Sequence, residues 1–191
     1  MKNKKVLIVG NKPHTFQLDN ILDSFDVVYR CNLAWPGNNN GTKFGRLAMC
    51  HHVYLNFVDR PVGKEQIMEI YGTDYDATYL SDWYDYFQAN KDNFDDIYHQ
   101  DEGKWRDWNN ILVGYGCPHT FSRMATTGYS TIFRNLSNTD QNEIYVSGFS
   151  LVDSKIRVSM GVLNEVIEKE SEGHGCHSNS DEMNILTWLH N

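Results

Sequence analysis

The chain has 191 residues, 40% of them hydrophobic, which is enough for one globular domain with a buried core. Its formal net charge of −8 disfavours a general nucleic-acid-binding protein, because such a protein carries a basic face. No apolar run approaches the ~20 residues of a membrane span, and the apolar run near the N-terminus is too short for a signal peptide, so we expect a cytoplasmic protein without a transmembrane segment.

The first expected element is a strand over residues 5–9, followed by a turn. Residues 6–9 are consecutive apolar residues, which is the pattern of a parallel strand buried on both faces. Gly10 permits a sharp turn, and ligands of open α/β sheets bind at the carboxyl ends of the strands. Gly10, Asn11 and Lys12 are therefore predicted to lie at the mouth of a binding site.

Strand and helix patterns alternate along the rest of the chain. In the first half of the chain we expect a helix over 15–24, a strand from 25 that ends at Arg30-Cys31-Asn32, a loop over 36–46, a strand over 52–56, a helix over 64–71 and a strand over 78–81. In the second half we expect a short apolar run at 111–113, a helix from 127 through 136, a strand over 143–148, and helices over 158–169 and 183–189. This alternation predicts a single α/β domain over residues 1–191. We expect a Rossmann-like, doubly wound and mostly parallel sheet with helices on both faces, and residues 150–176 as a candidate lid.

The first turn lacks a dinucleotide-binding pattern. Gly-Asn-Lys-Pro-His-Thr stands in place of GxGxxG, and the second strand does not end in an acidic residue, so NAD is not expected; a P-loop is also absent. Instead, neutral polar residues recur at the predicted strand ends: Asn11, Asn32, Asn56 and Thr126-Thr127. Such groups orient sugars and donate to phosphates, and a helix beginning at Gly128 adds backbone donors for an anion. Taken singly, each asparagine is more often a turn former or a helix cap than a ligand contact, and it is their recurrence at strand ends that favours a site.

The stretch before the last helix contains His177 and Glu182. Asn179 with Glu182 three residues on fits a capping box, which gives Glu182 a structural role. His177 then lies just outside a helix N-terminus, where the helix dipole disfavours the imidazolium and leaves the ring available as a base, while the charges of Asp181 and Glu182 act in the opposite direction. His174, Cys176 and His177 could instead bind a metal, but further ligands would have to come from elsewhere and the cysteines lack CxxC spacing, so no metal site is predicted.

Five short sequence blocks follow one another along the chain: Val-Leu-Ile-Val-Gly-Asn-x-Pro, Phe-Asp-Val-Val-Tyr-Arg-Cys-Asn, Thr-Thr-Gly, Glu-Ile-Tyr-Val-Ser-Gly, and a His-Ser before the last helix. In this order they resemble the bacterial sialyltransferases of glycosyltransferase family 42 and the sialylmotifs of the eukaryotic and viral family 29 enzymes. The resemblance implies transfer of sialic acid from CMP-sialic acid to a glycan hydroxyl with inversion. It implies a nucleotide-sugar donor and a glycan acceptor as partners, and no required metal or other cofactor.

The resemblance also implies roles for individual residues. His177, which with Glu182 matches the family's last motif, would be the general base that deprotonates the acceptor. Asn11 and Asn32 would hold the donor near its phosphate and sugar. Asn56 and Thr126-Thr127 would contact the sialic acid, including its carboxylate.

Two departures from the family pattern leave alternatives open. Lys12 replaces the glycine of the family's Asn-Gly-Pro turn, and no tyrosines follow the late Ser-Gly, where the bacterial enzymes use two against the departing phosphate. Lys155 or Arg157 is expected to supply a charge there instead. The alternatives are a catalytically inactive relative that binds CMP or a nucleotide sugar, and an α/β interaction protein whose asparagines only form turns.

Overall fold

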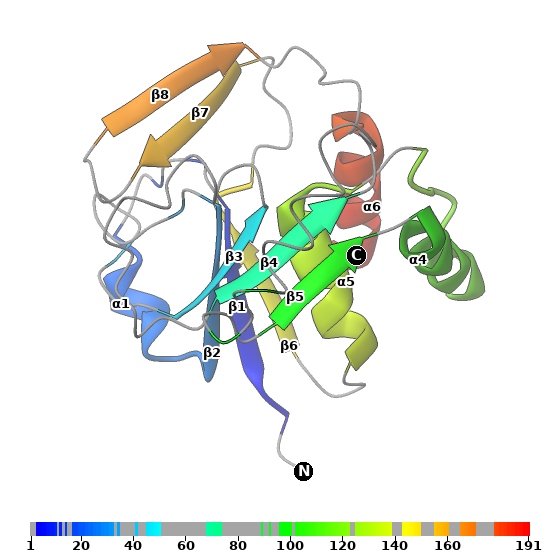
Figure 1. Ribbon diagram of the computed structural model, residues 1–191, viewed down its shortest axis with the longest axis horizontal. Coiled ribbons are helices and arrows are strands. Elements are labelled where there is room, and N and C mark those ends of the chain that lie inside the picture. Colours follow the sequence, from blue (N-terminus) through cyan, green and yellow to red (C-terminus); the bar gives the residue numbers. More distant parts are fainter. Residues whose placement is uncertain are drawn as a thin grey trace.

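A computed structural model describes residues 3–10, 12, 14, 17–32, 34, 41, 45–50, 68–73, 89, 92, 96–100, 102–122, 125–138, 143–149, 155–160, 165–170 and 178–191. Within these ranges one parallel sheet consists of β1 (Lys5–Val9), β2 (Val27–Cys31), β3 (Arg46–Cys50), β4 (Met68–Thr73), β5 (Asp96–Gln100) and β6 (Glu143–Ser147). The described helices are α1 (Asp19–Leu22), α4 (Glu102–Gly114), α5 (Thr127–Asn138) and α6 (Asn179–His190). A separate antiparallel hairpin consists of β7 (Lys155–Met160) and β8 (Glu165–Glu170) (Figure 1).

The strand order of the sheet identifies the place where a ligand site is expected. The order is β5-β4-β3-β2-β1-β6, and every neighbouring pair is parallel. The chain therefore adds strands in one direction from β1 to β5 and then places β6 on the other side of β1. In open α/β sheets, ligands bind outside the carboxyl ends of the strands where the order reverses. Here that switch point lies between β1 and β6.

β1 is buried on both faces, as its apolar run predicts. Val6 and Ile8 join one hydrophobic cluster with residues of α4, α5 and α6. Leu7 and Val9 join a second cluster with Leu22 of α1. Figure 1 shows the same division, with α1 on one side of the sheet and α4, α5 and α6 on the other. Burying each such side chain contributes roughly 1.5–3 kcal/mol, so this strand anchors both layers. The coarse α/β, parallel-sheet prediction is thereby confirmed.

The predicted helix over residues 64–71 is wrong at its C-terminal half. Residues 68–73 form β4, which pairs in parallel with β3 and β5. The helical spacing rested on Ile67, Ile70 and Tyr71, and three apolar residues within five positions fit a buried strand as well as a helix. The β-branched and aromatic pair at 70 and 71 suits the strand.

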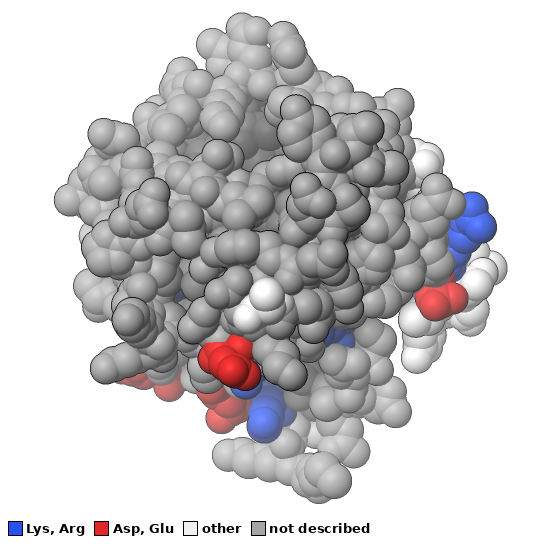
Figure 2. All heavy atoms as spheres, viewed as in Figure 1, with Lys and Arg blue, Asp and Glu red and all other residues white. Residues whose placement is uncertain are grey.

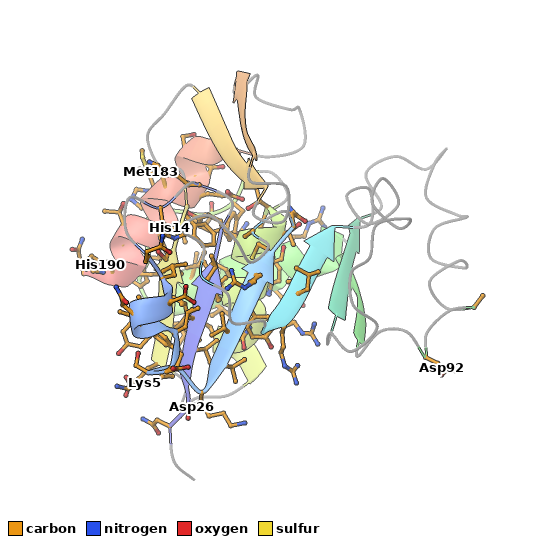
Figure 3. The ribbon with its side chains drawn as sticks, turned by 90° about the vertical axis from the view of Figure 1, so that its left-hand side faces the viewer. Lys5, His14, Asp26, Asp92, Met183 and His190 are labelled. Carbon is orange, nitrogen blue, oxygen red and sulfur yellow. The ribbon has the colours of Figure 1, made fainter. Side chains whose placement is uncertain are left out.

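The predicted helix over residues 158–169 is also wrong, because this segment contributes to the β7–β8 hairpin. Val158 lies opposite Ile167 in the register, and Arg157 lies opposite Glu168. β-branched pairs and opposite charges at facing positions both favour antiparallel pairing. Gly161 would in addition weaken a helix by about 1 kcal/mol relative to alanine. The hairpin falls within the predicted lid and lies beyond the carboxyl ends of the sheet strands in Figures 1 and 3.

The remaining predicted elements have mixed outcomes. β2, β6, α5 and α6 are confirmed, although α6 begins at Asn179 rather than 183, and the 15–24 helix is described only as the short α1. The apolar run 111–113 lies inside α4, β3 precedes the predicted strand at 52–56, and β5 was not predicted. The predicted strands at 52–56 and 78–81 lie outside the described residues. In the described part of the chain, no helix combines the length and the apolar character needed to cross a membrane.

Candidate functional site

The turns that follow β1 and β6 meet at the switch point of the sheet. The Gly10 N–H donates to the Ser147 carbonyl at 2.7 Å, and the Lys12 N–H donates to the Gly148 carbonyl at 2.8 Å. A Cβ on Gly10 would lie 2.4 Å from the Gly148 oxygen, and Gly148 has a φ of +72°. Both turns therefore need glycine, the first for close backbone approach and the second for its left-handed conformation.

Replacing Gly10 with Ala is expected to lower the free energy of unfolding by about 1–3 kcal/mol, because the new methyl group would overlap the backbone of the β6 turn. Urea unfolding measures the change. Gly114→Ala in α4 is the matched control, since its Cβ would meet nothing within 4 Å and alanine favours a helix. Equal stabilities of Gly10→Ala and the unmodified chain would contradict the close approach of the two turns at Gly10 and Gly148.

His14 links the same two turns through its side chain. The His14 ring is buried, and its Nε2 forms a 2.8 Å hydrogen bond with the Ser147 hydroxyl. Figure 3 shows His14 at the end of the sheet opposite to Lys5 and Asp26, which hydrogen-bond to each other at the amino ends of the strands. Sequence reasoning missed His14, because a single histidine in a turn carries no signal beyond its place after a buried strand.

The Thr-Thr-Gly block lies beside the β6 turn. Gly128 packs against the Phe149 ring, since a Cβ on Gly128 would come within 2.5 Å of a ring carbon. The Phe149 ring also makes an edge-on contact with Tyr129, at 5.9 Å between the ring centroids. The predicted site residues of the β1 turn and of the α5 start therefore come together around Gly148 and Phe149, although they are more than a hundred residues apart in the chain.

Glu182 reaches the same region from α6, and the predicted capping box is wrong. Ser178 is the N-cap of α6, and its hydroxyl accepts a hydrogen bond from the Asp181 N–H at 3.4 Å. Asn179 is the first helical residue instead. The Glu182 carboxylate accepts hydrogen bonds from the Thr126 N–H at 2.6 Å and from the Thr126 hydroxyl at 3.2 Å. Glu182 thus joins the start of α6 to the start of α5.

The surroundings of Glu182 make it a buried acid that titrates near neutral pH. Burial raises the pKa of Glu182 to about 7; the two hydrogen bonds from Thr126 oppose this shift, and the charge of Asp181 adds to it. Tyr129 is next to this charge, and burial together with Glu182 raises the pKa of its phenol. Among the described residues, the Tyr129 hydroxyl is the buried side-chain group for which no hydrogen-bond partner is found. The two hydrogen bonds from Thr126 are the contacts that favour the ionised form of Glu182.

The other predicted site residues have less defined positions. Asn32 follows β2 with a φ of +49°, and its N–H donates to the Ala48 carbonyl at 2.8 Å, which agrees with the turn-forming role of asparagine. Asn11, Asn56 and His177 lie outside the described residues, as do His174 and Cys176.

Lys155 and Arg157, the two predicted phosphate-stabilising residues, lie on β7. The register of the hairpin places Lys155 opposite Glu170 and Arg157 opposite Glu168. These four positions together carry no net charge. The register thus pairs each of these two basic positions with a glutamate position.

The described residues do not group into a metal-binding cluster. Figure 2 shows acidic and basic side chains beside each other on the described part of that face. Within the described ranges, no three His, Cys, Asp or Glu side chains gather in a way that could hold a metal ion. A scan against protein-family models and a search of curated proteins both find no match to this chain. The case for a function therefore rests on the sequence blocks and on the geometry at the switch point.

Proposed function

We propose that the chain is a sialyltransferase-like glycosyltransferase with a single Rossmann-like domain. It would transfer sialic acid from CMP-sialic acid to a glycan hydroxyl with inversion. The observation that supports this best is the meeting of three separate sequence blocks at the switch point: the turn after β1, the Ser-Gly turn after β6 and the Thr-Thr-Gly at the start of α5. Each block resembles the same enzyme family, and a ligand site is expected at this edge of a parallel sheet.

The donor would be held mainly by neutral donors and backbone groups. Gly10, Asn11 and Lys12 would surround the phosphate at the β1 turn, and Asn32 and Asn56 would contact the sugar portion. The start of α5 would direct backbone N–H groups toward the sialic acid carboxylate, because the first N–H groups of a helix lack partners within it and carry the positive end of its dipole.

In the transfer step, His177 would take the proton from the acceptor hydroxyl. The acceptor oxygen forms a bond to the anomeric carbon of the sialic acid, while the bond from that carbon to the phosphate oxygen breaks and CMP leaves as an anion. Positioning of the two substrates, the base and the phosphate donors supply the rate enhancement. Lys12, Lys155 and Arg157 are the basic residues available to the leaving phosphate in this proposal.

Cytidine nucleotides are expected to stabilise the chain against heat. A ligand at 100 times its dissociation constant adds ~2.7 kcal/mol, which raises the melting temperature of a domain of this size by about 5–10 °C. CMP and CMP-sialic acid should give this shift in a thermal-shift assay, and UMP and GMP are the controls. A transfer assay with CMP-sialic acid and a glycan panel then tests turnover. No shift with any cytidine nucleotide would contradict the proposal and favour an α/β interaction protein.

A second candidate is a catalytically inactive relative that still binds CMP or a nucleotide sugar. It is favoured by the missing tyrosines after the late Ser-Gly and by the glutamates that face Lys155 and Arg157 across the hairpin. This candidate predicts the CMP thermal shift with neither transfer nor donor hydrolysis. Detectable transfer would exclude it.

A further inference from the structure

Two adjacent carboxylates at the start of α6 hold the segment that leads into α5. Asp181 accepts hydrogen bonds from the N–H and the hydroxyl of Ser122. Glu182 accepts hydrogen bonds from the N–H and the hydroxyl of Thr126. Each carboxylate therefore binds both donors of a single residue, one on either side of residues 123–125.

The two carboxylates differ in their surroundings. The bonds between Asp181 and Ser122 are exposed, whereas Glu182 is 6% exposed and its bonds to Thr126 are partly buried. A charge-assisted hydrogen bond is stronger away from water, and an N–H that loses such a partner in a buried place is left unsatisfied. Glu182 is therefore the contact that fixes the start of α5, and Asp181 is a natural comparison for it.

The Glu182 bond determines which N–H groups remain for a ligand at this helix start. The Ser130 N–H donates to the Thr126 carbonyl, so α5 has its first intrahelical bond at Thr126. Thr126 uses its own N–H on Glu182. The N–H groups of Thr127 and Gly128 come next, and as helix-start donors they have no partner within the helix. An anion at this end of α5 would therefore bind the N–H groups of Thr127 and Gly128 rather than the N–H group of Thr126.

We propose that Glu182 is a positioning residue for the donor site: by binding Thr126 it orients the N–H groups of Thr127 and Gly128 toward the donor anion. The same bond ties this segment to the start of α6, the helix that follows His177 in sequence. Because this role rests on the proposed function, its test combines a measurement that needs no substrate with one that does.

The substrate-free measurement follows the Thr126 amide by NMR. Tyr129 of α5 and Asp181 of α6 are the described titratable groups that interact electrostatically with Glu182. We expect the Thr126 amide resonance to titrate near the Glu182 pKa of about 7 in the unmodified chain and to show no such step in Glu182→Gln. Hydrogen exchange at Thr126 should be about 10-fold or more faster in Glu182→Ala, and near the unmodified rate in Glu182→Gln, whose carbonyl still accepts the bond. Equal exchange in the Ala variant and the unmodified chain would overturn the contact.

The substrate-dependent measurement compares donor binding and turnover in the same variants, with Asp181→Asn as the matched control. We expect Glu182→Ala to weaken CMP-sialic acid binding about 10-fold or more, and Glu182→Gln and Asp181→Asn to stay close to the unmodified chain. If Glu182→Gln binds the donor as well as the unmodified chain does, the weaker binding of Glu182→Ala comes from the lost hydrogen bonds to Thr126 and not from the lost charge. If the unmodified chain binds donor but Glu182→Ala binds it equally well, the positioning role is wrong and the proposed function stands. If the unmodified chain binds no cytidine nucleotide, the proposed function fails and the role toward a donor fails with it.

Discussion

Replacing His177 with Ala is expected to abolish sialic acid transfer while CMP still binds. A positioned general base contributes typically ~10²–10⁴-fold to a rate, and an acceptor hydroxyl is a poor nucleophile until its proton is removed. CMP contains neither the acceptor nor its hydroxyl, so its affinity should not depend on the base. The measurements are kcat for transfer and the dissociation constant of CMP.

His174→Ala is the matched control for this experiment, because it removes a second imidazole from the same stretch. Under the general-base assignment it keeps its activity. Equal loss of activity in the two variants would instead favour the metal-binding alternative for His174, Cys176 and His177, which added metal and chelators then test. An active His177→Ala would refute the base assignment directly.

The sequence predicts the parallel sheet and its buried first strand, but it does not predict the identity of the shorter elements equally well. Residues 6–9 identify β1 because an uninterrupted apolar run suits only an element buried on both faces. β4 and the β7–β8 hairpin were misassigned because short apolar spacings fit both periods, and because facing charges such as Arg157 and Glu168 become visible only once the register is known.

The candidate site shows the same limit. Ser178 with Asp181 and Asn179 with Glu182 are overlapping capping patterns, and sequence alone does not choose between them. The choice is made by Thr126, which lies 56 residues from Glu182 and provides two donors for its carboxylate. Contacts at such a separation leave no periodic signal. The turns and the start of α5 were predictable from the sequence, whereas the N-cap of α6 and the contact that joins the two helix starts were not.

Arg30 of β2 is a buried charge that interacts with Asp19 of α1. Its side chain is fully buried, and its Nη1 donates to the Ala34 carbonyl at 3.1 Å. Burial lowers the pKa of Arg30 to about 10, and the charge of Asp19 on α1 opposes that shift. Arg30 immediately precedes Cys31 and Asn32, so it supports the strand end at which a predicted donor contact lies.

Arg30→Met is expected to lower the free energy of unfolding by about 1–3 kcal/mol, because the buried Ala34 carbonyl loses the hydrogen bond that it accepts from Arg30, whereas Asp19 is exposed and stays hydrated. Urea unfolding measures the loss, and Arg106→Met on the exposed face of α4 is the matched control, with an expected change within about 0.5 kcal/mol. Asp19→Asn alone is expected to cost less than Arg30→Met, because Asp19 is exposed and water screens its charge. An Arg30→Met variant as stable as the unmodified chain would mean that the methionine fills the site and that the charge contributes nothing to the fold.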